Sequence, residues 1–267
     1  MLTPLVQSLP SYLGSTKHLL QIIDSLPPQS PKTFLVTADV SSMYLKIPIE
    51  EGIDAVGKAM GEFKNLLPDN TPSPGIIQEF LSLILKNNYF SFMNKFYHQI
   101  DGTSMGTKCA PPYSGIFMGH LEKEIMASFN PHPFKLWLRY IDDILFLFKG
   151  SHSNLLKFLD HMNTFHKSIK FTSEYSKQSV NFLDVKIYRD QKGKLQTTLF
   201  KKSSKTNLFL HYDSFHPLHI FRNIVYGQCI RLCTIISTRL NLLVELSILK
   251  KAFLSRGYPK KMVNMQL

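Results

Sequence analysis

The spacing of apolar residues along the chain predicts several helices. Intervals of three and four residues are typical of helices that pack one face on a core, and they recur in four segments: 15–26, 48–63, 75–87 and 154–166. Pro27 and Pro28 end the first of these helices. Pro48 stands near the first position of the second helix, and Glu50 and Glu51 follow in its first turn, where acidic side chains are favoured.

Shorter apolar runs predict strands. The segment 32–40 is nearly all apolar, as expected of a buried strand, and two further strands flank a pair of aspartates within 136–148. Two segments predict β-hairpins: 89–100 around Asn94 and Lys95, and 180–200 around Gly193. A glycine-containing loop at 101–112 opens onto a helix near 113–129. Elements in this order predict an α+β fold with an antiparallel sheet and packed helices.

The stretch LWLRYIDDILFLF, Leu136 to Phe148, holds two adjacent aspartates in a run that is almost entirely apolar and aromatic. Burying an ionised carboxylate without a partner costs several kcal/mol, and neighbouring carboxylates also repel each other. Three arrangements resolve this conflict: an exposed hairpin turn, neutralisation by Arg139, or divalent cations bound by Asp142 and Asp143.

A second acidic position has the same local pattern. Asp39 ends the apolar strand 32–40 and is followed by two serines and then Tyr44. Carboxylate oxygens are the ligands that Mg²⁺ prefers, and it completes its shell with water and substrate phosphates. Two such ions about 3.5–4 Å apart stabilise the attacking and leaving oxygens of a phosphoryl transfer. Asp39 and the aspartate pair are therefore candidates for one two-metal site.

The charge of the chain is positive and uneven. With 31 Lys and Arg against 19 Asp and Glu, the formal net charge is +12, which indicates a polyanionic partner. Residues 199–267 carry +9 of this, so we expect the last quarter to be a basic module. A basic solubilising tail is the alternative, but apolar residues at helical spacing within 230–253 argue against it. Apolar runs all fall short of the roughly 18 residues that span a bilayer, so no membrane partner is expected.

Other chemistries have little support in the sequence. Cys229 and Cys233, three residues apart on a predicted helix without a second cysteine pair, have poor spacing for structural zinc, so none is expected. The chain also contains neither a Walker lysine loop nor a Gly-x-Ser-x-Gly nucleophile elbow.

A series of motifs in a fixed order carries a family resemblance. These are ADVSSMYLKIPIEEG, DGTSMGTKCAPPYSGIFMGHLE, RYIDDILF, VNFLDVKIYRDQKGKLQTTLFKK and HYDSFHP. Together they resemble the reverse transcriptases of Penelope-like retroelements, which are related to telomerase reverse transcriptase. The resemblance implies a polymerase palm with partial fingers over residues 1–203. It implies a basic helical module, similar to a thumb or a helix-turn-helix domain, over residues 204–267.

The resemblance also implies the site residues. Asp39, Asp142 and Asp143 would be catalytic, and the metals would be held by these three and by the Val40 carbonyl. Tyr44 would be the steric gate that rejects a ribonucleotide 2′-hydroxyl by clash. Further nucleotide contacts would come from Gly102, Ser104, Gly106, Thr107 and Tyr140, and nucleic-acid contacts from Lys108, Lys201, Lys202, Lys205, Arg222 and Arg231. Asp184 is expected to be structural.

The function implied by the resemblance is RNA-directed DNA polymerisation within a retrotransposon. A deoxynucleoside triphosphate would be added to a DNA primer 3′-hydroxyl on an RNA template, with two Mg²⁺ or Mn²⁺ ions, in the nucleus. The alternative is a catalytically inactive nucleic-acid-binding remnant, because only 38 residues precede Asp39 and the fingers are expected to be short.

Overall fold

The computed structural model describes residues 1–130, 133–201 and 209–266. The chain forms two compact units. Unit 1 consists of Met1–Gly14 and Lys32–Ser176, and unit 2 consists of Ser15–Pro31 and Lys177–Leu267. Among the described residues, no helix has the length and hydropathy needed to cross a membrane.

Unit 1 is built on a four-stranded antiparallel sheet with the order β4-β5-β1-β6. The strands are β1 (Thr33–Val40), β4 (Phe134–Tyr140), β5 (Asp143–Lys149) and β6 (Phe171–Ser176). Because β1 pairs with β5 on one side and β6 on the other, it is an interior strand, and most of its side chains are buried. This position explains why its sequence is a nearly continuous apolar run.

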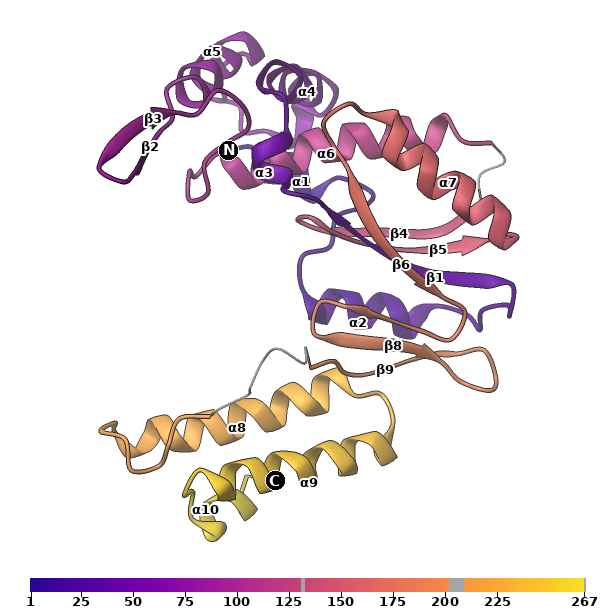
Figure 1. Cartoon of the computed structure of the whole chain (residues 1–267), viewed down its shortest axis with the longest axis vertical. Coiled ribbons are helices and arrows are strands. Elements are labelled where there is room, and N and C mark those ends of the chain that lie inside the picture. The colour runs from indigo at the N-terminus through magenta and orange to yellow at the C-terminus, as the bar shows by residue number, and fades with distance from the viewer. Residues whose placement is uncertain (131–132, 202–208, 267) are drawn as a thin grey trace. The chain divides into compact units, whose positions relative to one another are not determined.

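Helices α6 (Ala110–Ala127) and α7 (His152–Phe165) cover one face of this sheet (Figure 1). The core between them is aromatic: Trp137 stacks on Phe146 with ring centroids 4.7 Å apart, and Phe146 meets Phe158 of α7 edge to face. The remaining elements of unit 1 are α1 (Thr3–Gln7), α3 (Met43–Lys46), α4 (Ile49–Glu62), the 3₁₀ helix Lys64–Leu66, α5 (Pro74–Leu85) and the hairpin β2 (Tyr89–Phe92) and β3 (Lys95–His98).

Unit 2 combines a three-stranded antiparallel sheet with helices. The sheet has the order β7-β8-β9, from β7 (Ser179–Phe182), β8 (Val185–Arg189) and β9 (Leu195–Leu199). The helices are α2 (Thr16–Ser25), α8 (Leu218–Ile235), α9 (Arg239–Ser255) and α10 (Lys260–Asn264). Ser15 caps α2 by accepting a hydrogen bond from the His18 N–H at 3.2 Å. Both α2 and α8 contact β9, so the apolar face of the sheet is covered.

The antiparallel sheet with packed helices confirms the predicted α+β class. One local prediction needs correction. Residues 180–200 form three strands rather than one hairpin, because the chain turns at Leu183, with a φ of 55°, as well as at Gly193. The apolar residues at helical spacing within 230–253 lie in α8 and α9, which Ile236 separates by leaving helical geometry.

The two compact units divide the chain differently from the expected boundary between residues 203 and 204. The sheet β7-β8-β9 belongs to the same unit as the C-terminal helices, and α2 joins that unit from near the N-terminus. Contacts of α2 with β9 and α8 account for this division.

Gly52 and Gly61, both in α4, provide a matched test of packing between α4 and α6. A Cβ at Gly52 would lie 2.1 Å from the hydroxyl of buried Tyr113, whereas one at Gly61 would meet no described atom within 4 Å. We expect Gly52→Ala to lower the free energy of unfolding by about 1–3 kcal/mol through overpacking. We expect Gly61→Ala to raise it by about 0.5–1 kcal/mol through helix propensity. Urea unfolding monitored by Trp137 fluorescence measures both, and equal effects would contradict this packing.

Candidate active site

The pairing of β1 with β5 brings two of the three predicted catalytic aspartates together. Asp39 lies directly opposite Asp143 in the antiparallel register. Residues opposite each other in such a pair project from the same face, with Cβ atoms about 4.5–5.5 Å apart. Asp39 is exposed and Asp143 is half-buried, so solvent reaches the end of the sheet that carries them.

The third aspartate, Asp142, lies in the two-residue turn between β4 and β5. Tyr140 pairs with Asp143 across this turn, and Ile141 and Asp142 connect them. The Val40 N–H donates to the Asp142 carbonyl at 3.1 Å, which ties the turn to the end of β1. Ile141 has a φ of 59°, a left-handed conformation that is unusual for a β-branched residue. Strained backbone of this kind is concentrated at functional sites.

The side chain of Arg139 donates hydrogen bonds to Glu122 and to two backbone carbonyls. Its Nε donates to Glu122 Oε1 at 2.8 Å, and both side chains are almost fully buried, at 4% and 2% exposure. Its Nη1 donates to the Ile141 carbonyl at 3.1 Å and its Nη2 to the Gly115 carbonyl at 2.9 Å. Of the three arrangements open for the aspartates, the structure shows the hairpin turn, with Asp142 in the turn and Asp143 at the start of β5.

The carboxylates of Asp39 and Asp143 fit a divalent cation. Mg²⁺ is commonly held by one or two carboxylates and takes its other ligands from water and substrate phosphates. Within the described parts of the chain, no three His, Cys, Asp or Glu side chains are grouped closely enough to hold a metal by themselves. The fit therefore rests on the facing pair. Asp142 and the Val40 carbonyl stay predicted ligands.

Gly102 contacts a part of the chain that we did not predict. Its predicted contact with the nucleotide stays a prediction. A Cβ there would lie 2.3 Å from the Tyr44 carbonyl oxygen and 2.7 Å from the backbone of Leu45. The next N–H, of Thr103, donates to the Tyr44 carbonyl at 2.6 Å. The glycine loop thus holds the backbone of the predicted steric gate.

The rest of the loop is closed by its own hydrogen bonds. The hydroxyls of Ser104 and Thr107 are bonded to each other, and the Ala110 N–H donates to the Thr107 carbonyl at 3.0 Å at the start of α6. Lys108 is exposed. Burial raises the pKa of the Cys109 thiol, which keeps it protonated at neutral pH. Nucleotide contacts of Gly102, Ser104, Gly106, Thr107 and Tyr140 stay predictions.

The predicted nucleic-acid contacts in unit 2 separate into different groups. Lys201 pairs with Glu245 at 2.6 Å, and Arg231 donates to Asp184 Oδ2 at 2.8 Å, while Arg222 of α8 is exposed. Lys202 and Lys205 lie outside the described residues. Asp184 also accepts from the Thr16 hydroxyl at 3.1 Å, which agrees with the structural role expected for it.

The net positive charge of the chain comes entirely from unit 2. The residues of unit 2 include seventeen Lys and Arg against five Asp and Glu, a net charge of +12, whereas unit 1 contains fourteen basic and fourteen acidic residues.

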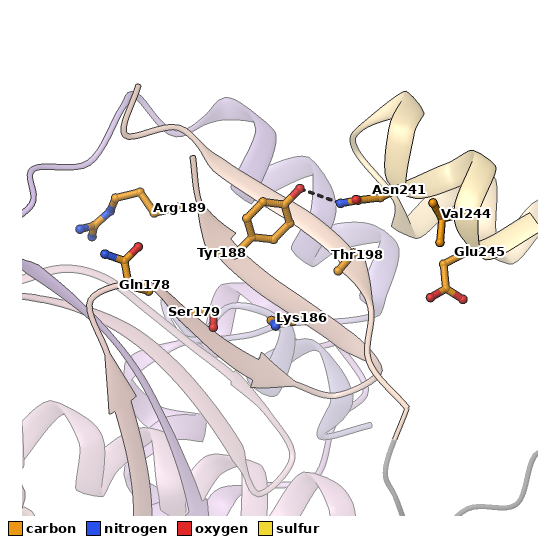
Figure 2. A pocket seen from close by; sticks show the side chains of 9 residues that line it. All are labelled: Gln178, Ser179, Lys186, Tyr188, Arg189, Thr198, Asn241, Val244 and Glu245. Atoms are coloured by element: carbon orange, nitrogen blue, oxygen red, sulfur yellow. Dashed lines mark hydrogen bonds between the residues drawn. The ribbon is translucent and has the colours of Figure 1, made fainter. Parts of the chain in front are cut away.

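A cavity of about 430 Å³ lies on the polar face of the β7-β8-β9 sheet in unit 2 (Figure 2). Lys186 and Tyr188 project from β8 toward it, and α9 contributes Asn241, whose amide donates to the Tyr188 hydroxyl at 2.9 Å.

Comparison with known proteins agrees with this arrangement. The family model for reverse transcriptase (RNA-dependent DNA polymerase) matches residues 4–205. The chain belongs to the reverse transcriptase family. A second model, for the animal helix-turn-helix domain, matches residues 208–267 of this reverse transcriptase family member. The search of curated proteins found no match.

Solved polymerase structures share the fold of this reverse transcriptase family member. Candida albicans telomerase, solved with a TWJ fragment of telomeric RNA, matches with a TM-score of 0.64 and 12% identity over 98% of this chain and 46% of its own. Apo telomerase from Candida tropicalis matches with a TM-score of 0.58 and 13% identity, over 99% of this chain and 50% of its own. The RNA-dependent RNA polymerase of a human picobirnavirus matches with a TM-score of 0.58 and 12% identity, over 96% of this chain and 49% of its own.

At these identities the similarity establishes the fold, and it supports the expected polymerase palm. The chain spans about half the length of the structures it matches.

The pairing of Arg139 with Glu122 was missed in the sequence, where Arg139 was considered only as a partner of the aspartates. Glu122 shares one helical face with the apolar residues Met118, Leu121 and Ile125 of α6, and Arg139 is a basic residue near the end of an apolar strand. Single opposite charges in two apolar patterns are a signal that the two residues pair when buried. The left-handed conformation of Ile141 leaves no such signal.

Gly102 and Gly106 together test the contact with Tyr44. Both have positive φ, so an alanine at either position carries a similar backbone cost, roughly 1–2 kcal/mol. A Cβ at Gly106 would have no described neighbour within 4 Å, whereas one at Gly102 would clash with backbone. We expect Gly102→Ala to lose about 1–3 kcal/mol more of the free energy of unfolding than Gly106→Ala. Paired urea titrations measure the difference, and a smaller loss at Gly102 would exclude the contact.

Proposed function

We propose that the chain is an RNA-directed DNA polymerase domain of a Penelope-like retroelement that acts in the nucleus. It adds a deoxynucleoside triphosphate to the 3′-hydroxyl of a DNA primer on an RNA template, and pyrophosphate leaves. The single observation that carries this proposal is the register that places Asp39 opposite Asp143 beside the turn that holds Asp142. The palm fold and the order of the motifs support the same assignment.

The chain's own residues would hold two divalent cations at this site. Asp39, Asp142, Asp143 and the Val40 carbonyl supply oxygen ligands, which suit Mg²⁺ and Mn²⁺. When bound, the ions stabilise the charge on the attacking and leaving oxygens. The role of the protein is to keep the aspartates on rigid strand ends, because catalysis by metal ions depends on fixed ligand geometry.

Tyr44 would select the sugar of the incoming nucleotide. It follows Asp39 by five residues and is half-buried, and the backbone of the glycine loop holds its carbonyl. A ring in this position rejects a 2′-hydroxyl by steric clash rather than by a hydrogen bond. Gly102 would act on the gate through its backbone contact with Tyr44. Contacts with the nucleotide itself are proposed for Gly102, Ser104, Gly106, Thr107 and Tyr140.

Unit 2 would bind the nucleic acid through phosphates. Its net charge of +12 suits the backbone of a template–primer duplex, for which charge matters more than base sequence. Arg222, exposed on α8, and Lys108, exposed in unit 1, remain proposed contacts. Lys201 and Arg231 would have to exchange their ion pairs with Glu245 and Asp184 for contacts to phosphate. Lys202 and Lys205 are proposed on the resemblance alone.

The second candidate function is nucleic-acid binding without catalysis, because unit 2 alone carries the net positive charge. Primer extension separates the two functions. We expect the wild-type protein to extend a DNA primer on an RNA template with Mg²⁺ or Mn²⁺. We expect Asp143→Asn to reduce the rate by at least about 100-fold while duplex binding is retained, because the carboxylate charge facing Asp39 is lost.

Asp160→Asn is the control for this experiment, since it makes the same change on the surface of α7, and it should extend at the wild-type rate. Wild-type extension no faster than that of Asp143→Asn, with duplex binding intact in both proteins, would leave only the binding function.

Replacing the ring of Tyr44 tests the sugar gate. We expect Tyr44→Ala to incorporate ribonucleotides about 10–100-fold more efficiently relative to deoxynucleotides, because the clash with the 2′-hydroxyl is removed. Tyr44→Phe keeps the ring and should discriminate like the wild type. Single-nucleotide incorporation kinetics with matched ribo- and deoxynucleotides measure the ratio, and an unchanged ratio in Tyr44→Ala would remove this role.

A further inference from the structure

Arg139 is the centre of a buried polar network in unit 1. Its three donor groups reach three acceptors: Glu122 Oε1, the Gly115 carbonyl and the Ile141 carbonyl. Glu122 is held in turn by the hydroxyl of Ser11, which donates to its Oε2 at 2.6 Å. Both charges are thus removed from water, and each makes hydrogen bonds in addition to the ion pair.

The backbone of Arg139 is held by the N-terminal segment. Its N–H donates to the Ser11 carbonyl at 2.6 Å, and its carbonyl accepts from the Leu13 N–H at 3.0 Å. Residues 11–13 therefore run along β4, the edge strand of the sheet, and Tyr12 forms a parallel bridge with Arg139. Arg139 is held on both its backbone and its side chain, two residues before the turn.

The bond from Arg139 to the Ile141 carbonyl acts on the strained residue itself. Ile141 is 44% exposed, so packing of its side chain contributes little to holding its left-handed conformation. Such conformations persist only where their surroundings hold them. One such restraint is the hydrogen bond from the Arg139 guanidinium, which Glu122 and the Gly115 carbonyl hold in place. Another is the hydrogen bond that the Val40 N–H donates to the Asp142 carbonyl.

We infer that the buried Arg139–Glu122 pair is a positioning element for the aspartate turn. Arg139 holds the carbonyl of Ile141 and so fixes the turn that places Asp143 opposite Asp39, the pair proposed to bind a divalent cation. The inference rests on the proposed function for its meaning, but it makes a separate structural claim about the turn. Partners that orient metal ligands typically affect metal affinity or activity by about 10–100-fold when they are mutated.

Arg139→Lys tests this role because it retains the buried charge. A single ammonium group lacks the planar fork that reaches three acceptors in fixed directions. Hydrogen exchange at the Val40 amide reports the turn directly, since that N–H is bonded to the Asp142 carbonyl. We expect exchange at Val40 to accelerate by at least about tenfold relative to exchange at Val56, a buried residue of α4 in the same unit.

The same variant should bind Mn²⁺ about 10–100-fold more weakly in an electron paramagnetic resonance titration with the metal alone. Arg256→Lys, which alters the hydrogen bond from Arg256 Nε to the Phe209 carbonyl in unit 2, is the control and should leave both readouts unchanged. If Arg139→Lys does not fold, Ser11→Ala removes a bond to Glu122 without removing either charge, and should change both readouts in the same direction by a smaller factor.

The outcomes separate this inference from the proposed function. Equal acceleration at Val40 and Val56, or no acceleration at Val40, would overturn the positioning role, even in a protein that extends primers. If the wild type neither binds Mn²⁺ nor extends primers, the proposed function fails. The exchange rates then still decide whether Arg139 holds the turn.

Discussion

The antiparallel register of β1 and β5 is the constraint on which the rest of unit 1 depends. A shift of one residue would move Asp39 to the opposite face of the sheet from Asp143, together with every apolar side chain of β1. The apolar side chains prevent this shift, because β1 lies between two strands and is buried along most of its length. Burial of the apolar side chains of β1 thus supplies the free energy that fixes the positions of the two carboxylates.

Polar residues in the interior of unit 1 refine this placement. The Arg139–Glu122 pair connects the N-terminal segment, α6 and the turn between β4 and β5. Burying two charges is costly, so such a pair contributes less to stability than its short distance suggests. Its effect is directional: each hydrogen bond requires one position of its partner, and the partner here is the backbone of Ile141.

The two units differ in net charge, and this difference matches the separate roles proposed for them. Unit 1 contains equal numbers of acidic and basic residues, so the carboxylates at its site belong to a unit without an excess of positive charge. Unit 2 carries the full positive charge and no more than five acids. A cation site and a phosphate-binding surface have opposite electrostatic requirements, and separate units satisfy both.

The sequence by itself determined the elements and the identity of the candidate site. Apolar periodicity defined the strands around Asp39 and the aspartate pair, because that pattern is local. Only the tertiary structure decided which distant groups meet: Asp39 with Asp143, Gly102 with the backbone of Tyr44, and Arg139 with Glu122. It also decided that α2 and the β7-β8-β9 sheet join the basic helices. These outcomes depend on register and packing between remote segments, which local patterns do not specify.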